Sequence, residues 1–513
     1  MTSALRAFAG CAAILIASTN IARAQADTIP GVATPVVSTR HQITLDGQPF
    51  AYTARAGILP IRNNDDGSAR AYIFFVAYIA DRAAGQQPRP LTFAWNGGPG
   101  ANSLLLHLSA FGPRRLDSRD GDASARTAPR LVDNQETLLG FTDLVFVDPV
   151  GTGFSRPAEA RFAPDFYGVL EDIAATREFI RTYRTRFEDW DRPVFLAGES
   201  YGTWRAAGTA EAMEKSEERV AGVILISGGI PVGPLASAEM RAALFLPQRV
   251  ATAAYHRKLS PDLQGDPQRA MKEAEDWGRA TYAPALVRRE ALSGAERDAI
   301  AARLARYTGL DTSAVDRKTL VVDRPFLLDN LIRKGGDSAR GALGRFDTRQ
   351  IAGGAAEADA AMQAPRRRML INHYLRDALG FKTDLVYQGL ETGYSPSREP
   401  REPNGLWKWD QGTPGAPLVL NSDGPPGGTP PWVQRTFALD RDTKTFVGVG
   451  IYDSLNSCAL VTYQASQLDP ALRGNISLGC YEGGHMMYED RAARVRLSRD
   501  LARFYPTASS QWR

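Results

Sequence analysis

The sequence is poor in the residue types from which metal and redox centres are built. Its 513 residues include only 3 cysteines and 5 histidines. The two cysteines of the C-terminal part, Cys458 and Cys480, are too far apart for a zinc motif. Beyond the first 26 residues, no segment has the roughly 18 unbroken apolar residues that a membrane-spanning helix needs. We therefore expect no metal, no cofactor and no membrane span.

An excess of charge of one sign is also lacking. The formal net charge is +4 at pH 7, and two of the excess positive charges are Arg6 and Arg23, near the N-terminus. Binding to nucleic acid normally requires a strongly basic surface. A chain of this size with so small a net charge is therefore not expected to have nucleic acid as a partner.

The first 26 residues read MTSALRAFAGCAAILIASTNIARAQA. An arginine is followed by a run of apolar and small residues and then by alanine-rich sites, which predicts a secretory signal peptide cleaved after Ala24 or Ala26. The mature protein is then expected in the periplasm or outside the cell. At 43% hydrophobic residues, it is long enough to form one large core and an accessory element.

The most informative segment is VFLAGESYGTWRAAG at 194–208. An apolar strand runs into Gly-Glu-Ser-Tyr-Gly and then into residues compatible with a helix. This order is typical of a nucleophile elbow, in which two glycines allow a sharp turn and the serine between them is held at the strand tip. The pattern predicts that Ser200 is a catalytic nucleophile.

A second apolar strand ends in a glycine-rich turn, LTFAWNGGPGANS at 91–103. An enzyme that transfers acyl groups must place backbone N–H donors about 3 Å from the developing oxyanion, and glycine allows that approach. We predict that the donors are the N–H groups of Tyr201 and Gly98, with Gly97 shaping the turn. No Lys-Ser or Lys-Thr pair follows the loop, so a phosphate-binding loop is not indicated.

Five motifs resemble those of the serine carboxypeptidase family and occur in the same order. They are WNGGPG at 95–100, FGP at 111–113, DLVFVDPVGTGFS at 143–155, GESYG at 198–202 and GHM at 484–486. The resemblance, together with the leader, implies a secreted, bacterial type of this family. It also implies the α/β-hydrolase fold, in which the triad follows the order Ser, then Asp or Glu, then His.

That order selects the remaining members of the triad. Of the histidines, His485 alone lies downstream of every plausible acid, in a glycine-containing loop after a short strand. The apolar run TKTFVGVGIYDSLNS at 443–457 ends in Asp453, which would orient the imidazole and stabilise its protonated form. Asp453 could also cap a helix. His107, which follows the glycine-rich loop on a helical stretch, is interpreted as a packing residue or a wall of the substrate site.

The resemblance further implies that Asn96 and Glu199 bind the free C-terminal carboxylate of a peptide. Two carboxyl groups in contact cannot both remain charged at low cost, so Glu199 would share a proton with the substrate and activity would fall as pH rises. The family has a second glutamate close to its Gly-Pro, where this chain has Ala110. Arg205 is either a compensating charge or a surface residue of the helix after the elbow.

The fold class is therefore predicted as α/β, with a mostly parallel central sheet, antiparallel N-terminal strands and a large helical cap insertion. Strands are expected at 91–95, 144–148, 194–198 and 222–229, antiparallel strands within 39–80, and a helix at 167–187. The domains are expected to be a signal peptide at 1–26, the first part of the core at 27–230, the cap at 231–410 and the second part of the core at 411–513. The cap contains a capping box at Ser293 and Glu296 and ends in a Pro- and Gly-rich segment at 393–405. Its many charges are interpreted as a solvated helix surface. Cys458 and Cys480 could form a disulfide or remain two buried thiols.

The predicted function is that of a serine carboxypeptidase-like hydrolase, in which Ser200 attacks the last peptide carbonyl and water resolves the acyl-enzyme. The partner would be a peptide with a free C-terminus. An esterase or acyltransferase on the same scaffold is the alternative, and Ala110 favours it. A binding protein with a relic triad is disfavoured, because a nucleophile, an oxyanion loop, an acid and a base are all present.

Overall fold

The computed structural model describes residues 36–82, 87–117, 129–228, 232–332, 341–351, 365–392, 407–408 and 431–510. The predicted signal peptide and the Pro- and Gly-rich segment at 393–405 lie outside these residues. Within the described part of the chain, no helix is long and apolar enough to span a membrane.

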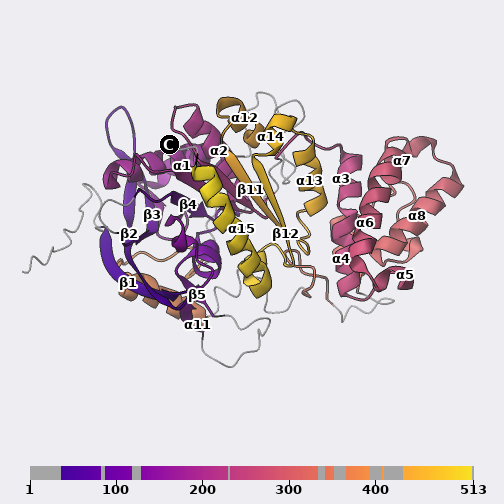
Figure 1. Ribbon diagram of the computed structural model, residues 1–513, viewed down its shortest axis with the longest axis horizontal. Coiled ribbons are helices and arrows are strands. Elements are labelled where there is room, and N and C mark those ends of the chain that lie inside the picture. The colour runs from indigo at the N-terminus through magenta and orange to yellow at the C-terminus, as the bar shows by residue number, and fades with distance from the viewer. Residues whose placement is uncertain are drawn as a thin grey trace, which may run out of the picture.

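A ten-stranded sheet runs through the molecule in the order β1-β2-β3-β7-β4-β9-β10-β11-β12, with β8 paired to β3 (Figure 1). Its strands are β1 Val37–Leu45, β2 Gln48–Arg62, β3 Ala69–Ala80, β4 Leu91–Trp95, β7 Asp143–Val147, β8 Arg156–Pro157, β9 Val194–Glu199, β10 Gly222–Ile226, β11 Lys444–Gly450 and β12 Ile476–Tyr481. A separate hairpin joins β5 Arg114–Leu116 to β6 Leu131–Asp133.

The strand directions follow the predicted pattern. The pairs β1–β2, β2–β3 and β3–β7 are antiparallel, whereas β7, β4, β9, β10, β11 and β12 are parallel to one another. The carboxyl ends of parallel strands meet at one edge of a sheet, where α/β proteins bind their ligands. This places the residues after β4, β9, β11 and β12 close together.

Helices cover both faces of the sheet, as Figure 1 shows. Alternate residues of β9 reach opposite cores: Leu196 packs on one side and Phe195 on the other. One core takes side chains from α1 Val169–Phe187, α2 Gly202–Glu214, α12 Trp432–Leu439 and α13 Cys458–Ser466. The other takes them from η1 Leu106–Phe111, α11 Pro365–His373, η7 Tyr374–Ala378 and α15 Arg491–Ser509. The shorter helices are η2 Leu138–Gly140, η3 Ala160–Asp165, α14 Pro470–Arg473 and η9 Met487–Glu489.

Between β10 and β11 the chain forms a helical group with its own apolar core, at the right of Figure 1. Its helices are α3 Ala238–Leu244, α4 Leu246–Tyr255, α5 Pro261–Gln264, α6 Pro267–Trp277, η4 Gly278–Tyr282, α7 Ala283–Val287, η5 Arg289–Ala291, α8 Gly294–Thr308, η6 Thr312–Ala314 and α9 Arg324–Asn330. The predicted capping box is present at the start of α8. In contrast, α11 and η7 pack on the sheet with β2 and β3. The residues between β10 and β11 therefore form two separate parts, the helical group and the α11–η7 pair on the sheet.

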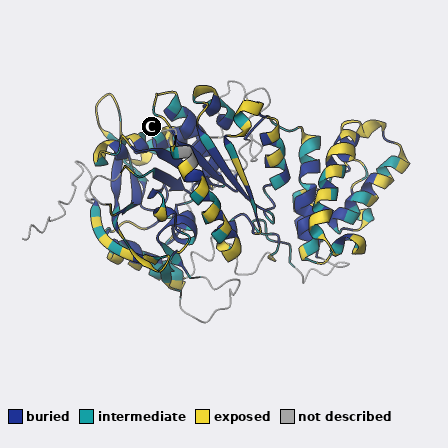
Figure 2. Ribbon diagram, in the orientation of Figure 1, coloured by how far each residue is buried: buried dark blue, intermediate teal, exposed yellow. Residues whose placement is uncertain are grey.

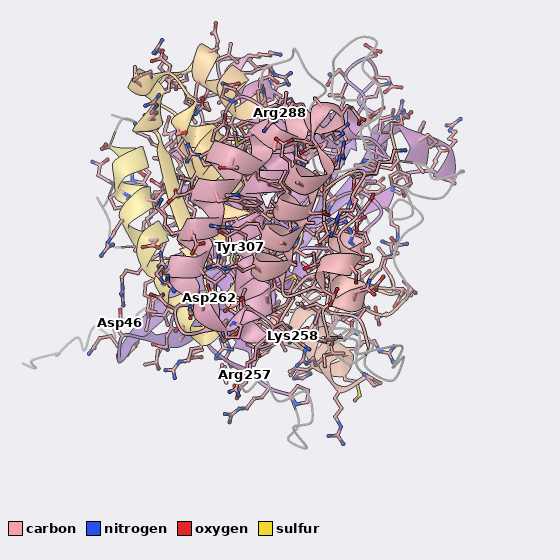
Figure 3. The ribbon with its side chains drawn as sticks, turned by 90° about the vertical axis from the view of Figure 1, so that its right-hand side faces the viewer. Asp46, Arg257, Lys258, Asp262, Arg288 and Tyr307 are labelled. Atoms are coloured by element: carbon pink, nitrogen blue, oxygen red, sulfur yellow. A yellow bond between two sulfur atoms is a disulfide. The ribbon has the colours of Figure 1, made fainter. Side chains whose placement is uncertain are left out.

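Buried and exposed faces alternate along the helices of this group (Figure 2), as an amphipathic pattern requires. On its outer side, seen in Figure 3, Asp262 of α5 pairs with Arg306 of α8. Arg306 also contacts Glu273 at 2.7 Å, and Glu273 accepts a hydrogen bond from Tyr307 at 2.9 Å. Such partly exposed ion pairs contribute little stability individually, which agrees with the predicted solvated helix surface.

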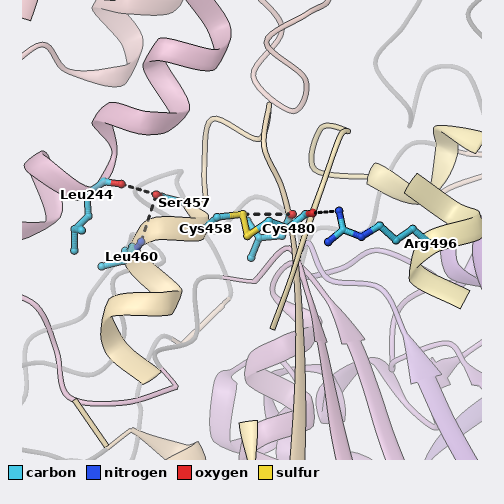
Figure 4. Close-up of a disulfide and its surroundings, with 7 residues drawn as sticks. Leu244, Ser457, Cys458, Leu460, Cys480 and Arg496 are labelled. Carbon is cyan, nitrogen blue, oxygen red and sulfur yellow. Dashed lines mark hydrogen bonds between the residues drawn. A yellow bond between two sulfur atoms is a disulfide. The ribbon is translucent and has the colours of Figure 1, made fainter. Parts of the chain in front are cut away.

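Cys458 and Cys480 form a disulfide with a sequence separation of 22 residues. It links the first residue of α13 to β12 (Figure 4). Beside it, Ser457 accepts a hydrogen bond from the Leu460 N–H, and its hydroxyl donates to the carbonyl of Leu244 in the helical group. A bridge closing a loop of this length restricts the unfolded chain, an effect worth about 3 kcal/mol. The bridge flanks the loops that carry Asp453 and His485.

Candidate active site

Ser200 occupies a sharp turn between β9 and α2. Its φ is +58°, a left-handed conformation that costs a non-glycine residue roughly 1 kcal/mol or more. The turn is held by the N–H of Ser200, which donates to the carbonyl of Ile226 at 2.9 Å, and by the hydroxyl of Thr203, which donates to the Ser200 carbonyl at 2.7 Å. A Cβ at Gly198 would lie 1.9 Å from the carbonyl oxygen of Gly202, so the turn requires glycine there. The predicted strand, elbow and helix are all present.

Asp453 is fully buried just after β11, and both of its carboxylate oxygens have partners. Oδ2 lies 2.8 Å from Nδ1 of His485 and accepts a hydrogen bond from Nδ2 of Asn456 at 2.7 Å. Oδ1 accepts from the N–H of Leu455 at 2.8 Å. Asn456 also donates to the carbonyl of Ser227 at 2.9 Å, which ties the carboxylate to the end of β10. The cap of α13 is Ser457 rather than Asp453.

His485 is buried in the loop after β12, with 3% of its surface exposed. Its N–H donates to the carbonyl of Phe346 at 2.6 Å, and the two rings lie 5.3 Å apart. Its Nε2 lies 3.4 Å from Oε1 of Glu199. Burial lowers the pKa of the imidazole, but the carboxylates of Asp453 and Glu199 outweigh burial and raise that pKa above 6.5. The imidazole of His485 therefore holds its proton more strongly than a free histidine does.

The structure thus brings Asp453, His485 and Glu199 into direct contact. Ser200 follows Glu199 directly and is partly exposed, whereas Glu199 is buried. Among the described residues, Nε2 of His485 has no hydrogen-bond partner, so the hydroxyl of Ser200 does not contact it in this state. Such hydrogen bonds are often long without substrate and shorten when it binds.

Asn96 and Glu199 form a buried pair at the ends of neighbouring strands. Nδ2 of Asn96 donates to Oε2 of Glu199 at 2.8 Å, and 1% and 3% of the two residues are exposed. Oδ1 of Asn96 accepts from the N–H of Leu106 in η1 at 3.0 Å. The amide is therefore fixed from both sides, and the carboxyl of Glu199 is shared between Asn96 and His485.

The glycine-rich loop lies directly against the elbow. A Cβ at Gly97 would lie 2.4 Å from the backbone nitrogen of Tyr201. Gly98 follows with φ of +107°, a conformation that other residues avoid. Gly97 is thus the glycine that contacts the elbow, and Gly98 is the adjacent residue. The assignment of the N–H groups of Gly98 and Tyr201 to an oxyanion hole stays a prediction.

The interpretation of Arg205 as a surface residue is wrong. Only 1% of it is exposed. Its Nε donates to Oδ2 of Asp172 in α1 at 2.8 Å, and its Nη1 donates to the carbonyl of Asn96 at 2.9 Å. Tyr201 donates its hydroxyl to the same Asp172 at 3.1 Å. Burial raises the pKa of Asp172 despite the nearby guanidinium. Arg205, held by Asp172, thus fixes the backbone carbonyl of Asn96. Because Arg205 and Asp172 are 33 residues apart, no local sequence pattern indicated that they would pair.

His107 belongs to the core rather than to the catalytic groups. Its ring stacks on Phe146 at 4.4 Å, and its Nε2 lies 2.6 Å from the hydroxyl of Tyr78. Burial lowers the pKa of His107 to about 3. Of the two predicted roles, the packing role is the one that these contacts support.

The neutral, buried state of His107 predicts an acid-labile contribution to stability. The unfolded chain binds a proton near pH 6.5, whereas the folded chain does so only near pH 3. The contribution of neutral His107 to the free energy of unfolding is therefore fully present above pH 6.5, and it is lost as the pH falls from 6.5 towards 3. Between pH 7 and pH 5 we expect this residue to account for a loss of about 2 kcal/mol. Urea unfolding at both pH values should show a smaller loss in His107→Phe than in the wild type. An equal loss would mean that the fold does not lower the pKa of His107.

Sequence reasoning missed the segment 341–351, which contacts the histidine loop. Besides Phe346, it carries Arg345, whose carbonyl accepts a hydrogen bond from Ser454 at 2.5 Å. The guanidinium lies 5.5 Å from the Phe346 ring, and its positive charge opposes the rise in the pKa of His485. No motif surrounds these residues in the sequence, so only the fold reveals them.

Metal-binding groups are lacking in the part of the chain that the structure describes. No group of three or more His, Cys, Asp or Glu side chains there is arranged so that it could hold a metal ion. The chemistry available at the described site is that of a carboxylate, an imidazole, a hydroxyl and backbone N–H groups.

Residues 47–228 match the sequence profile of the serine carboxypeptidase family. The chain is 35% identical over 157 residues to the pheromone-processing carboxypeptidase KEX1 of Saccharomyces cerevisiae, a match that covers 28% of this chain and 20% of the yeast protein. It is 29% identical over 189 residues to serine carboxypeptidase-like 45 of Arabidopsis thaliana, covering 36% of this chain and 37% of the plant protein. These matches span a minor part of either relative.

The solved structure of the yeast prohormone-processing carboxypeptidase KEX1 resembles this one over 89% of this chain and 91% of the yeast chain, with a TM-score of 0.53 and 16% identity. At this identity the likeness concerns the fold. The α/β-hydrolase fold predicted from the sequence is confirmed.

Proposed function

We propose that the protein is a serine carboxypeptidase that removes C-terminal residues from peptides. Ser200 is the nucleophile, His485 accepts its proton and later gives it to the leaving amine, and Asp453 orients the imidazole. The hydroxyl oxygen of Ser200 bonds to the peptide carbonyl carbon, the amine leaves, and water hydrolyses the acyl-enzyme. The N–H groups of Gly98 and Tyr201 stabilise the oxyanion.

The observation that carries this proposal is the buried Asn96–Glu199 pair beside the nucleophile. A carboxypeptidase must recognise a terminal carboxylate near the bond that it cleaves. An amide donor and a carboxyl that can hold a proton together offer hydrogen bonds to such a group.

The contact between Glu199 and His485 gives this recognition a catalytic consequence. In the free enzyme the carboxylates of Asp453 and Glu199 raise the pKa of His485 above 6.5, so the imidazole holds its proton more strongly than a free histidine does. A substrate carboxylate at Asn96 disfavours the ionised form of Glu199, so the proton moves to Glu199. His485 is then neutral and able to accept the proton of Ser200. Binding of a free C-terminus thereby prepares the base.

The test compares one blocked dipeptide as the free acid and as the amide. The free acid should be cleaved while the pair retains its proton, and its rate should fall as pH rises above the raised pKa of His485. The amide should be a poor substrate at every pH, because it lacks the carboxylate that Asn96 and Glu199 are proposed to bind. Equal rates for acid and amide at every pH would reject the carboxypeptidase proposal.

Glu199→Gln tests the shared proton directly. Glutamine keeps the hydrogen-bonding shape but cannot ionise, so one of the carboxylates that raise the pKa of His485 is removed. We expect the rate on the free acid to decline at a higher pH than in the wild type, because the amide of glutamine stays a donor at all pH values. The pH dependence of kcat/KM measures this effect. An unchanged profile would separate Glu199 from the titration.

An esterase or acyltransferase is the second candidate, and one observation favours it. The position of the family's other glutamate is held by Ala110, which is buried and exposes 2% of its surface. The terminal carboxylate would then be held by fewer groups. Efficient hydrolysis of simple esters with no preference for a free C-terminus would support this alternative.

The location and the cap are also proposals. The leader at 1–26 supports export of the enzyme, in a bacterial type, to the periplasm or the medium. Within the predicted insertion at 231–410, set between core parts at 27–230 and 411–513, the helical group and the segment 341–351 are proposed to cover the active site, whereas α11 and η7 pack on the sheet. In support, the hydroxyl of Thr252 in the helical group lies 2.8 Å from that of Thr348, next to the Phe346 segment.

A further inference from the structure

A cavity lies between the N-terminal strands and the helix pair α11–η7, which are close to each other at the lower left of Figure 1. It has a volume of about 480 Å³ and shares no residue with the candidate active site. We name it the lateral cavity, and its polar walls include His41, Tyr52, Arg114, Arg130, His373 and Tyr374. Its volume is within the range of about 300–1,000 Å³ that is usual for small-molecule sites.

The charged groups that line the lateral cavity are basic, and no Asp or Glu is among its lining residues. The acids nearby bind the outer sides of the same arginines: Asp133 pairs with Arg114, and Asp117 accepts from Nε of Arg130 at 2.8 Å. Each acid therefore orients a guanidinium, which has five donors in a fixed plane. His373, a further basic side chain of the lining, contacts Asp377 at 2.7 Å, so the guanidinium groups of Arg114 and Arg130 are the donors that favour an anion.

Flat rings form the rest of the wall. The ring of His41 stacks on Tyr52 at 5.5 Å with an angle of 20° between the planes. Burial, together with Arg114, lowers the pKa of His41, so this ring is neutral at neutral pH. Leu131 and Leu370 add apolar surface. The walls are suited to the flat apolar ring of a ligand. The arginines are suited to one anionic group attached to that ring.

The back of the lateral cavity is rigid. The hydroxyl of Tyr374 lies 2.8 Å from that of Tyr78, which in turn lies 2.6 Å from Nε2 of His107. Tyr52 and Tyr78 pack edge to face at 5.7 Å. Because these buried polar groups satisfy one another, the cavity keeps its shape without a ligand, and little binding energy is lost in ordering it.

We propose that the lateral cavity is a binding site for a small aromatic carboxylate. The rings of His41, Tyr52 and Tyr374 contact the aromatic body, and Arg114 and Arg130 bind the carboxylate. This site does not depend on the proposed function, because none of its residues takes part in the proposed chemistry.

The experiment measures binding to the full mature chain by calorimetry at neutral pH. The probes are indole-3-acetate, its neutral isostere indole-3-acetamide, and tryptophan, which adds an ammonium group. We expect indole-3-acetate to bind saturably and at least about tenfold more tightly than indole-3-acetamide, the size expected for a lost charge-assisted hydrogen bond. Tryptophan should also bind more weakly than indole-3-acetate, because its ammonium group is repelled by the two guanidinium groups. Equal affinities, or no saturable binding of indole-3-acetate, would overturn the proposal.

Arg130→Met is the test variant, because the side chain of Arg130 is 68% exposed and the loss of an exposed ion pair should cost little stability. It should weaken indole-3-acetate binding about tenfold or more, and Arg130→Lys should restore part of that loss. Glu199→Gln serves as the control for the active site and should leave the dissociation constant unchanged. If Glu199→Gln abolished binding, or Arg130→Met had no effect, the ligand would not be in the lateral cavity.

Discussion

Replacing Ser200 by alanine is expected to lower kcat on blocked dipeptides by about 10⁶-fold, since the members of a catalytic triad act as a unit. The variant should also lose covalent labelling by a fluorophosphonate, which reacts with an activated serine. The physical reason is the position of Ser200, held at φ of +58° at the tip of β9 beside the buried Glu199–His485 contact. The fold should be retained, because the hydrogen bonds of the turn come from backbone groups and Thr203.

The matched control is Ser227→Ala. Ser227 follows β10 as Ser200 follows β9, and the register pairs Ile226 with Glu199. Ser227 also has a positive φ, +49°. Its variant should retain labelling and most of its activity. Labelling that persists in Ser200→Ala but disappears in Ser227→Ala would move the nucleophile to the neighbouring strand.

The interaction within the triad is tested by combining variants. His485→Ala should be nearly as damaging as Ser200→Ala, and the double variant should be no worse than either, because each change alone already stops the proton transfer. Additive losses would contradict this assignment. Fluorophosphonate labelling and kcat should decline together in all three variants.

The sheet could be predicted closely from the sequence because its parallel strands are buried on both faces. Such strands appear as short, nearly continuous apolar runs between glycines and polar residues. The run at 91–95 coincides with β4 Leu91–Trp95, and that at 194–198 differs from β9 Val194–Glu199 by one residue. The arrangement of the helices after β10 could not be predicted, because an amphipathic pattern shows that a helix has an apolar face but not what that face contacts. Thus α11 packs on the sheet, away from the helical group.

The same limit applies to the candidate site. Ser200, Asp453 and His485 could be selected as candidate triad residues because each follows a strand and the fold fixes their order along the chain. The carbonyl of Phe346, which accepts from the His485 N–H, belongs to a segment without a motif. The Arg205–Asp172 pair joins two helices, and neither residue differs locally from a surface charge. Contacts between distant segments of this kind require the three-dimensional structure.

The Cys458–Cys480 bridge was left open by the sequence, since a spacing alone does not determine whether two sulfurs meet. The fold places Cys458 at the start of α13 and Cys480 in β12 with their Cα atoms 5.9 Å apart. This distance is within the usual range for a disulfide. The bridge therefore connects the two segments that carry the acid and the base of the proposed triad.

Asp453→Asn is expected to lower kcat by about 10⁴-fold while leaving the fold intact. The reason is the set of donors around the carboxylate. Oδ2 faces Nδ1 of His485 and the amide of Asn456, and Oδ1 faces the N–H of Leu455. An asparagine has one oxygen and one NH₂ group, so one of these donors must face another donor. If the NH₂ group faces His485, Nδ1 must become the acceptor, and the proton moves to Nε2, where the base is needed.

The other orientation keeps the oxygen towards His485 and places the NH₂ group against the N–H of Leu455. That arrangement leaves a buried donor unsatisfied, at a cost of about 1–3 kcal/mol, and it removes the negative charge that raises the pKa of His485. In both orientations the imidazolium formed during catalysis loses its counter-charge. Asn456→Ala is the matched control: it removes one hydrogen bond to Oδ2 but leaves the charge and the tautomer, so kcat should fall only about tenfold. Measuring kcat for both variants, with circular dichroism to verify folding, distinguishes the two roles. A loss in Asp453→Asn no greater than in Asn456→Ala would show that Asp453 supports the loop and is not the acid that orients the imidazole of His485.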